Sequence, residues 1–279
     1  MPLISLVSVK GSPGVTTTAL ALATVWPAQR RLLAEFDPAG GDLGVRLGLP
    51  PGGGLAGLAA STRRPHAHHS LWPFAPELAG GMHVLAAPPG AEQASACLHT
   101  LAAGGVLRRL AAGAATAQAV VIADCGRLDP GCPTRQAGVS AGAVLVVARP
   151  HLSDLAHLAG RLDAIRQQAN LAGLVLVTGG KLPRTDPAYP AREITRALGV
   201  RVLGSLPADP RGVCALLAGR GQPAATRRLP LARAARALAE SLAGSVPAAF
   251  EAAAGPAPAD GETASAARRA GSGVAVIRR

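Results

Sequence analysis

A short segment near the start of the chain combines a lysine, glycines and threonines in the manner of a phosphate-binding loop. It reads Lys10-Gly11-Ser12-Pro13-Gly14-Val15-Thr16-Thr17-Thr18 and follows an apolar run, Leu3–Val9. Glycine lets a backbone approach a phosphate closely, and a helix that begins here would aim its free N–H groups and its dipole at the same anion. Threonine hydroxyls could bind phosphate oxygens or Mg²⁺. The expected contacts come from Gly11, Ser12, Gly14, Val15, Thr16 and Thr17.

One residue departs from the usual phosphate-loop pattern, GxxxxGK[ST]. Val15 stands where a lysine ordinarily reaches the β- and γ-phosphates, and valine has neither charge nor donor. Losing such a charge-assisted hydrogen bond weakens binding by roughly 1.5–3 kcal/mol, about 10- to 150-fold. We therefore expect weakened binding, and slow or absent phosphoryl transfer because the transition state loses more than the ground state. A glycine-rich turn that binds nothing is the alternative.

Two aspartates follow apolar runs at points where chemistry is expected. Asp37 comes directly after Arg31–Phe36, and Asp124 comes directly after Ala119–Ala123. The carboxyl ends of parallel strands meet at one edge of a sheet, which is where α/β proteins bind their ligands. Both carboxylates are therefore expected beside the phosphate loop. The alternative is that they are polar residues that end strands.

The elements that must position these residues alternate along the chain. Apolar runs of strand length predict a parallel sheet covered on both faces. They are Leu3–Val9, Arg31–Phe36, His83–Ala86, Ala119–Ala123, Ala143–Ala148, Leu174–Thr178 and Arg201–Leu203. Helical spacing of apolar residues is found over Thr16–Val25, Ala94–Ala112, Leu152–Gln168, Ala191–Leu198 and Leu229–Leu242. The predicted fold is a doubly wound α/β domain with a mostly parallel sheet of about seven strands.

Composition bounds the remaining possibilities. The chain has 279 residues and a formal net charge of +12, which favours contact with nucleic acid or an anionic membrane surface. The four cysteines show no CxxC spacing, and no apolar run approaches the roughly 18 residues of a membrane span, so we expect a reduced, cytoplasmic protein. His66, His68 and His69 lack acidic or cysteine companions, so no metal site is expected there. We expect one domain over residues 1–246 and a disordered tail over Pro247–Arg279, which lacks periodicity.

Taken together, these motifs resemble the MinD/ParA family of P-loop ATPases, of the SIMIBI class. The loop at Lys10 is similar to the family's deviant pattern KGGxGK[ST], with Ser12 and Val15 as departures. The segment Leu32-Leu33-Ala34-Glu35-Phe36-Asp37-Pro38 resembles hhhDxDP, with Glu35 in place of the first Asp. The run Val120-Val121-Ile122-Ala123-Asp124 is similar to the Walker B strand, and Leu203-Gly204-Ser205-Leu206-Pro207-Ala208-Asp209 to the strand and loop that flank adenine. The resemblance covers about Leu3–Leu242.

The resemblance implies ATP or ADP with Mg²⁺ as cofactors and a homodimer formed across the nucleotide. It implies that Lys10 crosses to the partner's nucleotide, that Asp37 orients the attacking water or the switch, and that Asp124 and Thr16 hold Mg²⁺, Asp124 through water. Pro207 and Asp209 would lie beside the adenine, although the family's base-reading Asn is not evident at Thr178-Gly179-Gly180. The missing charge could come from Lys10 of either subunit or from an arginine such as Arg127, Arg149 or Arg211.

Family members with altered phosphate loops are similar to the TadZ/CpaE proteins, which place pilus-assembly machinery at a cell pole. The leading hypothesis is thus a dimerising spatial regulator with a pilus, secretion or chromosome-partitioning partner, peripheral to the membrane or the nucleoid. A ParA-type DNA-partitioning ATPase, a pseudo-ATPase scaffold without nucleotide and a CobQ-like ligase are the alternatives. DNA or an anionic membrane would meet an arginine-rich face formed by Arg220, Arg227, Arg228, Arg233 and Arg236, which could equally be a solvated helix face.

Overall fold

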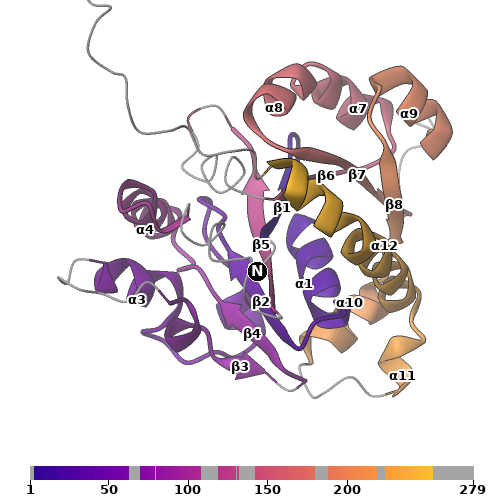
Figure 1. Cartoon of the computed structure of the whole chain (residues 1–279). Coiled ribbons are helices and arrows are strands. Elements are labelled where there is room, and N and C mark those ends of the chain that lie inside the picture. Colours follow the sequence, from indigo (N-terminus) through magenta and orange to yellow (C-terminus); the bar gives the residue numbers. More distant parts are fainter. Residues whose placement is uncertain are drawn as a thin grey trace, which may run out of the picture.

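A mixed sheet of eight strands forms the centre of the protein (Figure 1). The computed structural model describes residues 3–62, 70–78, 80–107, 119–129, 131, 142–179, 188–218 and 224–253. The strands are β1 (Leu3–Ser8), β2 (Arg30–Glu35), β3 (Glu77–Leu78), β4 (Met82–Leu85), β5 (Ala119–Arg127), β6 (Ala143–Ala148), β7 (Leu171–Thr178) and β8 (Val202–Pro207). Their order across the sheet is β3-β4-β2-β5-β1-β6-β7-β8, and every neighbouring pair is parallel except β3 with β4.

Helices cover both faces of this sheet. They are α1 (Val15–Val25), α2 (Leu43–Arg46), α3 (Gly54–Ser61), α4 (Ala91–Ala103), α7 (Leu152–Ala159), α8 (Leu162–Gln168), α9 (Ala191–Leu198), α10 (Pro210–Leu217), α11 (Ala224–Arg227) and α12 (Pro230–Ala253), with a 3₁₀ turn η1 (Trp72–Phe74). Helices α1, α10 and α12 pack together on one face, while α3, α4, α7, α8 and α9 cover the other. The predicted doubly wound, mostly parallel α/β fold is confirmed.

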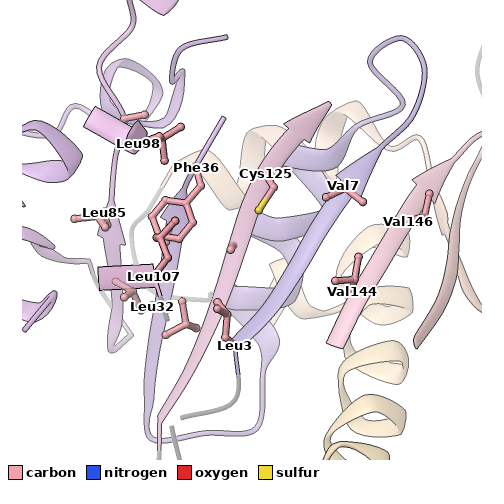
Figure 2. Packing of buried hydrophobic residues seen from close by; sticks show 14 of the residues in the cluster. Leu3, Val7, Leu32, Phe36, Leu85, Leu98, Leu107, Cys125, Val144 and Val146 are labelled. Carbon is pink, nitrogen blue, oxygen red and sulfur yellow. The ribbon is translucent and has the colours of Figure 1, made fainter. Parts of the chain in front are cut away.

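The strands are apolar nearly throughout because both faces are buried. In β1, Ile4 and Leu6 face α1 and α12, whereas Leu3 and Val7 face the opposite layer. Figure 2 shows this opposite layer, where Phe36 lies between strand residues and Leu98 of α4. Burial of these side chains on the two faces supplies the apolar area that stabilises the sheet.

Several element boundaries differ from those predicted. The strand β3 has only two residues, too few to leave a pattern, and it raises the number of strands from about seven to eight. The predicted helix Leu152–Gln168 is two helices, because Gly160 weakens the helix and the Arg161 N–H bonds to the Leu158 carbonyl in a tightened turn. Helix α4 ends at Ala103, before the pair Gly104 and Gly105, rather than at Ala112.

The end of the chain agrees in part with expectation. Helix α12 packs on the sheet through Leu231, Ala235, Leu238 and Leu242, which are buried. It runs to Ala253, so the segment from Pro247, expected to be a tail, begins as helix; residues 254–279 lie outside the described part, and the expectation of disorder there stays a prediction. Within the described residues, no helix has the length and apolarity that a membrane crossing requires.

Candidate functional site

The turn between β1 and α1 has the shape expected of a phosphate loop. Gly11 and Gly14 adopt φ values of 61° and 103°, in the left-handed region that favours glycine. Helix α1 begins directly after Gly14, and the amides of its first turn have no helix carbonyl to bond. An anion above this turn would meet those amides and the positive end of the helix dipole.

Val15 brings only an apolar side chain to this anion site. Its side chain is 7 % exposed and packs in the apolar cluster that contains Ile4, Leu6 and Ala19. Lys10 is exposed, and it is absent from the described linings of the two cavities beside the loop. Neither position therefore brings a positive charge into the site within one subunit.

Asp124 lies inside β5 beside the loop. The strand was expected to end before this residue but continues to Arg127, so the carboxylate is fully buried. The Gly126 N–H donates to Oδ1 at 3.1 Å, whereas Oδ2 is buried and accepts no hydrogen bond within the part of the chain that the structure describes. Burial raises the pKa of Asp124 to about 7, the nearby carboxylates of Glu35 and Asp37 add to this, and the Thr16 hydroxyl and the Gly126 N–H oppose it.

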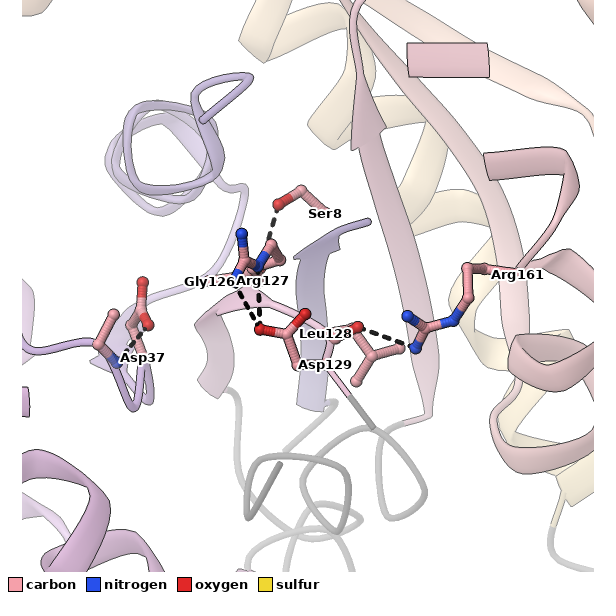
Figure 3. Close-up of polar contacts among 8 residues, drawn as sticks. Ser8, Asp37, Gly126, Arg127, Leu128, Asp129 and Arg161 are labelled. Carbon is pink, nitrogen blue, oxygen red and sulfur yellow. Dashed lines mark hydrogen bonds and ion pairs between the residues drawn. The ribbon is translucent and has the colours of Figure 1, made fainter. Parts of the chain in front are cut away.

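Asp37 lies at the end of β2, against the segment that follows Asp124. Its Oδ1 accepts a hydrogen bond from the Ala39 N–H at 2.8 Å, which fixes the turn after the strand. Its carboxylate packs on Gly126, where a Cβ would overlap it (Figure 3). Burial raises the pKa of Asp37, and the positive charge of Arg127 opposes the shift. The structure thus brings the two predicted aspartates to the same edge of the sheet as the loop.

Glu35 has a role that the sequence did not indicate. It is 1 % exposed, and its Oε1 accepts hydrogen bonds from the N–H groups of Asp42 and Leu43 at 2.8 and 3.1 Å. Its Oε2 accepts from the Ala87 N–H at 3.0 Å. Burial raises the pKa of Glu35, and these three backbone donors oppose the shift. Glu35 therefore ties the loop after β2 to the loop after β4. The departure from Asp at this position was the only signal in the sequence.

A cavity of about 550 Å³ lies over the phosphate loop. It is lined by loop and first-turn residues, by the segment after β2 and by the end of β5: Ser8, Gly11, Ser12, Gly14, Val15, Thr16, Thr17, Glu35, Asp37, Pro38, Ala39, Gly40, Asp42, Arg46, Gly126, Arg127 and Asp129. We call it the phosphate cavity. Its walls combine backbone donors, hydroxyls, carboxylates and arginines, which is the set of groups that a Mg²⁺-phosphate ligand needs.

A second cavity, of about 450 Å³, adjoins the first and shares Ser12, Gly14 and Thr17 with it. We call it the nucleoside cavity, because the predicted adenine-flanking residues Pro207 and Asp209 line it. The carboxylate of Asp209 is used by the backbone: Oδ1 accepts from the Gly212 N–H at 3.0 Å, and Oδ2 accepts from the Leu231 N–H at 3.3 Å. Asp209 thus caps α10 and joins it to α12, which shapes this wall of the cavity.

The three arginines that could supply the missing positive charge differ in their positions relative to the two cavities. Arg127 lines the phosphate cavity, and Arg149 lines the nucleoside cavity. Arg149 donates from Nη2 to the Ser12 carbonyl at 3.1 Å, so it supports the loop from outside. Arg211 is exposed and is absent from the described linings of both cavities. Sequence order alone could not separate these three.

The oxygen donors of the phosphate cavity fit a magnesium ion. Behind the lining residues Thr16 and Gly126, Asp124 has a buried Oδ2 with no hydrogen-bond partner among the described residues, and the Thr16 hydroxyl lies close to the same carboxylate. Hard oxygen ligands of this kind suit Mg²⁺, which keeps much of its water. Among the residues that the structure describes, no cluster of three His, Cys, Asp or Glu side chains forms a separate metal site. His66, His68 and His69 lie outside the described residues.

Several solved structures of MinD and ParA ATPases have a fold similar to that of this chain. The cell-division ATPase MinD of Pyrococcus furiosus superposes with a TM-score of 0.67 at 20% identity, over 87% of this chain and 98% of that one. The septum site-determining protein MinD of Pyrococcus horikoshii OT3, complexed with Mg-ADP, gives 0.65 at 20% identity, over 88% and 98%. A ParA family ATPase of Chlorobium tepidum TLS gives 0.66 at 16% identity, over 86% and 98%. No protein-family model and no curated protein matches the sequence. The chain has the fold of MinD/ParA-type P-loop ATPases.

Proposed function

We propose that this protein binds an adenine nucleotide with Mg²⁺ and acts as a dimerising spatial regulator of the MinD/ParA kind, with weak or absent hydrolysis. One observation carries the proposal: the glycine turn at the start of α1 and Asp37 line a single cavity, which shares Ser12, Gly14 and Thr17 with a second cavity beside Pro207. The buried Asp124 lies next to two residues that line the first cavity, Thr16 and Gly126. The combined shape suits a nucleotide whose phosphates lie on the loop and whose base lies near residues 207–209. The Mg-ADP complex of a MinD with the same fold supports the choice of ligand.

In this proposal the loop amides and the α1 dipole bind the phosphates. Thr16 and Asp124 hold Mg²⁺, with water between the metal and Asp124, and Asp37 orients the attacking water or the switch. When bound, Mg²⁺ neutralises charge on the phosphate oxygens. Hydrolysis is expected to be slow, because the side chain of Val15 is buried in the core and adds no cation to the transition state.

The regulatory part of the proposal requires a nucleotide-dependent dimer. Lys10 is exposed, which is compatible with the proposed contact to a partner's nucleotide. The exposed arginines Arg227, Arg228 and Arg233 near the start of α12 would contact DNA or an anionic membrane surface. A protein of the pilus, secretion or chromosome-partitioning machinery would be the downstream partner.

The testing experiment is equilibrium binding of ATP and ADP to the purified protein with Mg²⁺, beside light-scattering measurement of its mass with each nucleotide. Binding at micromolar nucleotide and an ATP-dependent rise to the dimer mass are expected, and Lys10→Ala should bind nucleotide but remain monomeric. Absence of binding at millimolar nucleotide would leave a pseudo-ATPase scaffold as the better account. Binding without dimerisation would remove the regulatory switch and keep the nucleotide site.

A further inference from the structure

Two arginines that the phosphate-loop pattern does not provide line the phosphate cavity, and one of them, Arg46, forms an ion pair with Asp42 at 2.6 Å. Arg127 is at the end of β5, three residues after the buried Asp124, and it lines the cavity together with Thr16, Thr17 and Asp37. Its positive charge opposes the rise that burial causes in the pKa of Asp37. Arg127 and the residue proposed to orient water therefore line the same cavity.

The side chain of Arg127 is 55% exposed, forms an ion pair and keeps N–H groups that are not used. Its Nε donates to Asp129 Oδ2 at 2.9 Å, and its Nη2 forms an ion pair with the same oxygen at 2.9 Å (Figure 3). Among the described residues, no acceptor bonds Nη1, whose two N–H groups are available to a ligand. Asp129 thus fixes the guanidinium while leaving part of its donor fork unused.

The backbone around Arg127 is fixed as well. The Leu128 N–H donates to the Ser8 carbonyl at 2.8 Å. Arg161 Nη2 donates to the Leu128 carbonyl at 3.0 Å (Figure 3). These two bonds join the segment to β1 and to the start of α8. A cation held by such contacts loses little freedom when it binds an anion, so more of the interaction contributes to affinity.

We propose that Arg127, positioned by Asp129, binds the terminal phosphate of ATP and supplies the charge that Val15 does not. The inference rests on the proposed nucleotide site. Arg149 is a poorer candidate because it lines the nucleoside cavity and donates to the Ser12 carbonyl, away from Asp37 and Thr16. Lys10 is a poorer candidate within one subunit because it is absent from the described linings of both cavities. A guanidinium also matches phosphate with two parallel hydrogen bonds, which a lysine cannot do.

The test is calorimetric titration of ATP and ADP, each with Mg²⁺, into the wild type and into Arg127→Ala, Arg127→Lys, Arg149→Ala and Arg211→Ala. Arg211 is the matched control, since it is exposed and absent from both described linings. Arg127→Ala should weaken ATP binding by roughly 10- to 150-fold, the loss of one charge-assisted contact. ADP affinity should change less than about threefold, Arg127→Lys should lose less than Arg127→Ala, and Arg211→Ala should match the wild type.

A double variant tests whether a positive charge at position 15 can replace the one at position 127. In Arg127→Ala, the added change Val15→Lys should restore ATP affinity at least tenfold, because a lysine would again reach the phosphates. Circular dichroism and Tm establish that each variant is folded. If the lysine introduced by Val15→Lys prevents folding of the double variant, the comparison of Arg127→Lys with Arg127→Ala still tests the role of Arg127.

The outcomes separate the two proposals. If the wild type binds neither nucleotide, the proposed function fails and this inference falls with it. If the wild type binds ATP and Arg127→Ala retains its affinity within threefold, only the role of Arg127 is overturned. Equal losses for ATP and ADP in Arg127→Ala would contradict the contact with the terminal phosphate, and a loss confined to Arg149→Ala would assign the charge to Arg149.

Discussion

The carboxylate of Asp37 packs directly on the backbone of Gly126, at a point where any Cβ would overlap it. This contact joins the end of β2 to the last part of β5 and holds Asp37 within the phosphate cavity. Gly126 also donates its N–H to Asp124, so a single glycine fixes both aspartates. The relation explains why a residue without a side chain is needed immediately beyond the buried carboxylate.

Gly126→Ala should therefore destabilise the protein more than an alanine at another glycine with positive φ does. Gly126 has φ 59°, and its Cβ would meet a carboxylate, whereas Gly48 has φ 62° with nothing within 4 Å. We expect a loss of about 3 kcal/mol in unfolding free energy for Gly126→Ala and about 1 kcal/mol for Gly48→Ala. Urea unfolding measures both. Equal losses of unfolding free energy in the two variants would mean that Asp37 moves away from the new Cβ without destabilising the protein.

Removing the Glu35 carboxylate should destabilise the fold. Its two oxygens satisfy three buried backbone N–H groups, so Glu35→Ala leaves donors without partners and costs about 3 kcal/mol. Glu35→Gln keeps one carbonyl oxygen and should lose less. The exposed Glu240 of α12 provides the control, with Glu240→Ala expected within about 0.5 kcal/mol of the wild type in urea unfolding. Wild-type stability of Glu35→Ala would contradict a structural role for these bonds.

The free energy of unfolding should fall as pH rises, because Asp124 loses its proton. Burial raises its pKa from 3.8 to about 7, so between these values the unfolded chain has released a proton that the folded protein keeps. Folding therefore becomes less favourable as pH rises, by roughly 3 kcal/mol between pH 5 and 8 at about 1.4 kcal/mol per pKa unit. Asp124→Asn does not titrate and should lack this loss.

The measurement is urea unfolding of the wild type and Asp124→Asn with a chelator across this pH range. Glu35 and Asp37 are present in both proteins, so their raised pKa values largely cancel in the comparison. Parallel pH profiles would show that Asp124 is ionised in the folded protein. Addition of Mg²⁺ should recover stability of the wild type at pH 8, because a cation favours the ionised carboxylate.

Thr16→Ala should reduce the contribution of Mg²⁺ to nucleotide binding. The Thr16 hydroxyl lies beside Asp124 and lines the phosphate cavity, where Mg²⁺ is proposed to bind. We expect ATP affinity with Mg²⁺ to fall about tenfold while affinity in a chelator stays near the wild-type value. Titrations in the two buffers check this, with Thr100→Ala on the exposed side of α4 as control. An equal fall in both buffers would assign the hydroxyl to phosphate rather than to metal.

Much of this protein could be predicted from local patterns. Seven of the eight strands follow from apolar runs of strand length, because a strand buried on both faces needs apolar residues throughout. The turn at Gly11 and Gly14 follows from its glycines and from the helix pattern after it. The order of the motifs also indicated that Asp37 and Asp124 would meet the loop at the carboxyl edge of the sheet.

The sequence could not predict which distant residues would form hydrogen bonds with each polar side chain. Glu35 bonds the Ala87 N–H, Asp209 bonds the Leu231 N–H, and Arg149 bonds the Ser12 carbonyl, and each pair is far apart along the chain. Local periodicity depends on near neighbours, whereas buried polar atoms must find partners wherever packing brings them. For that reason the sequence determined the loop and its missing lysine, while only the tertiary structure distinguished Arg127, which lines the phosphate cavity, from Arg149 and Arg211, which do not.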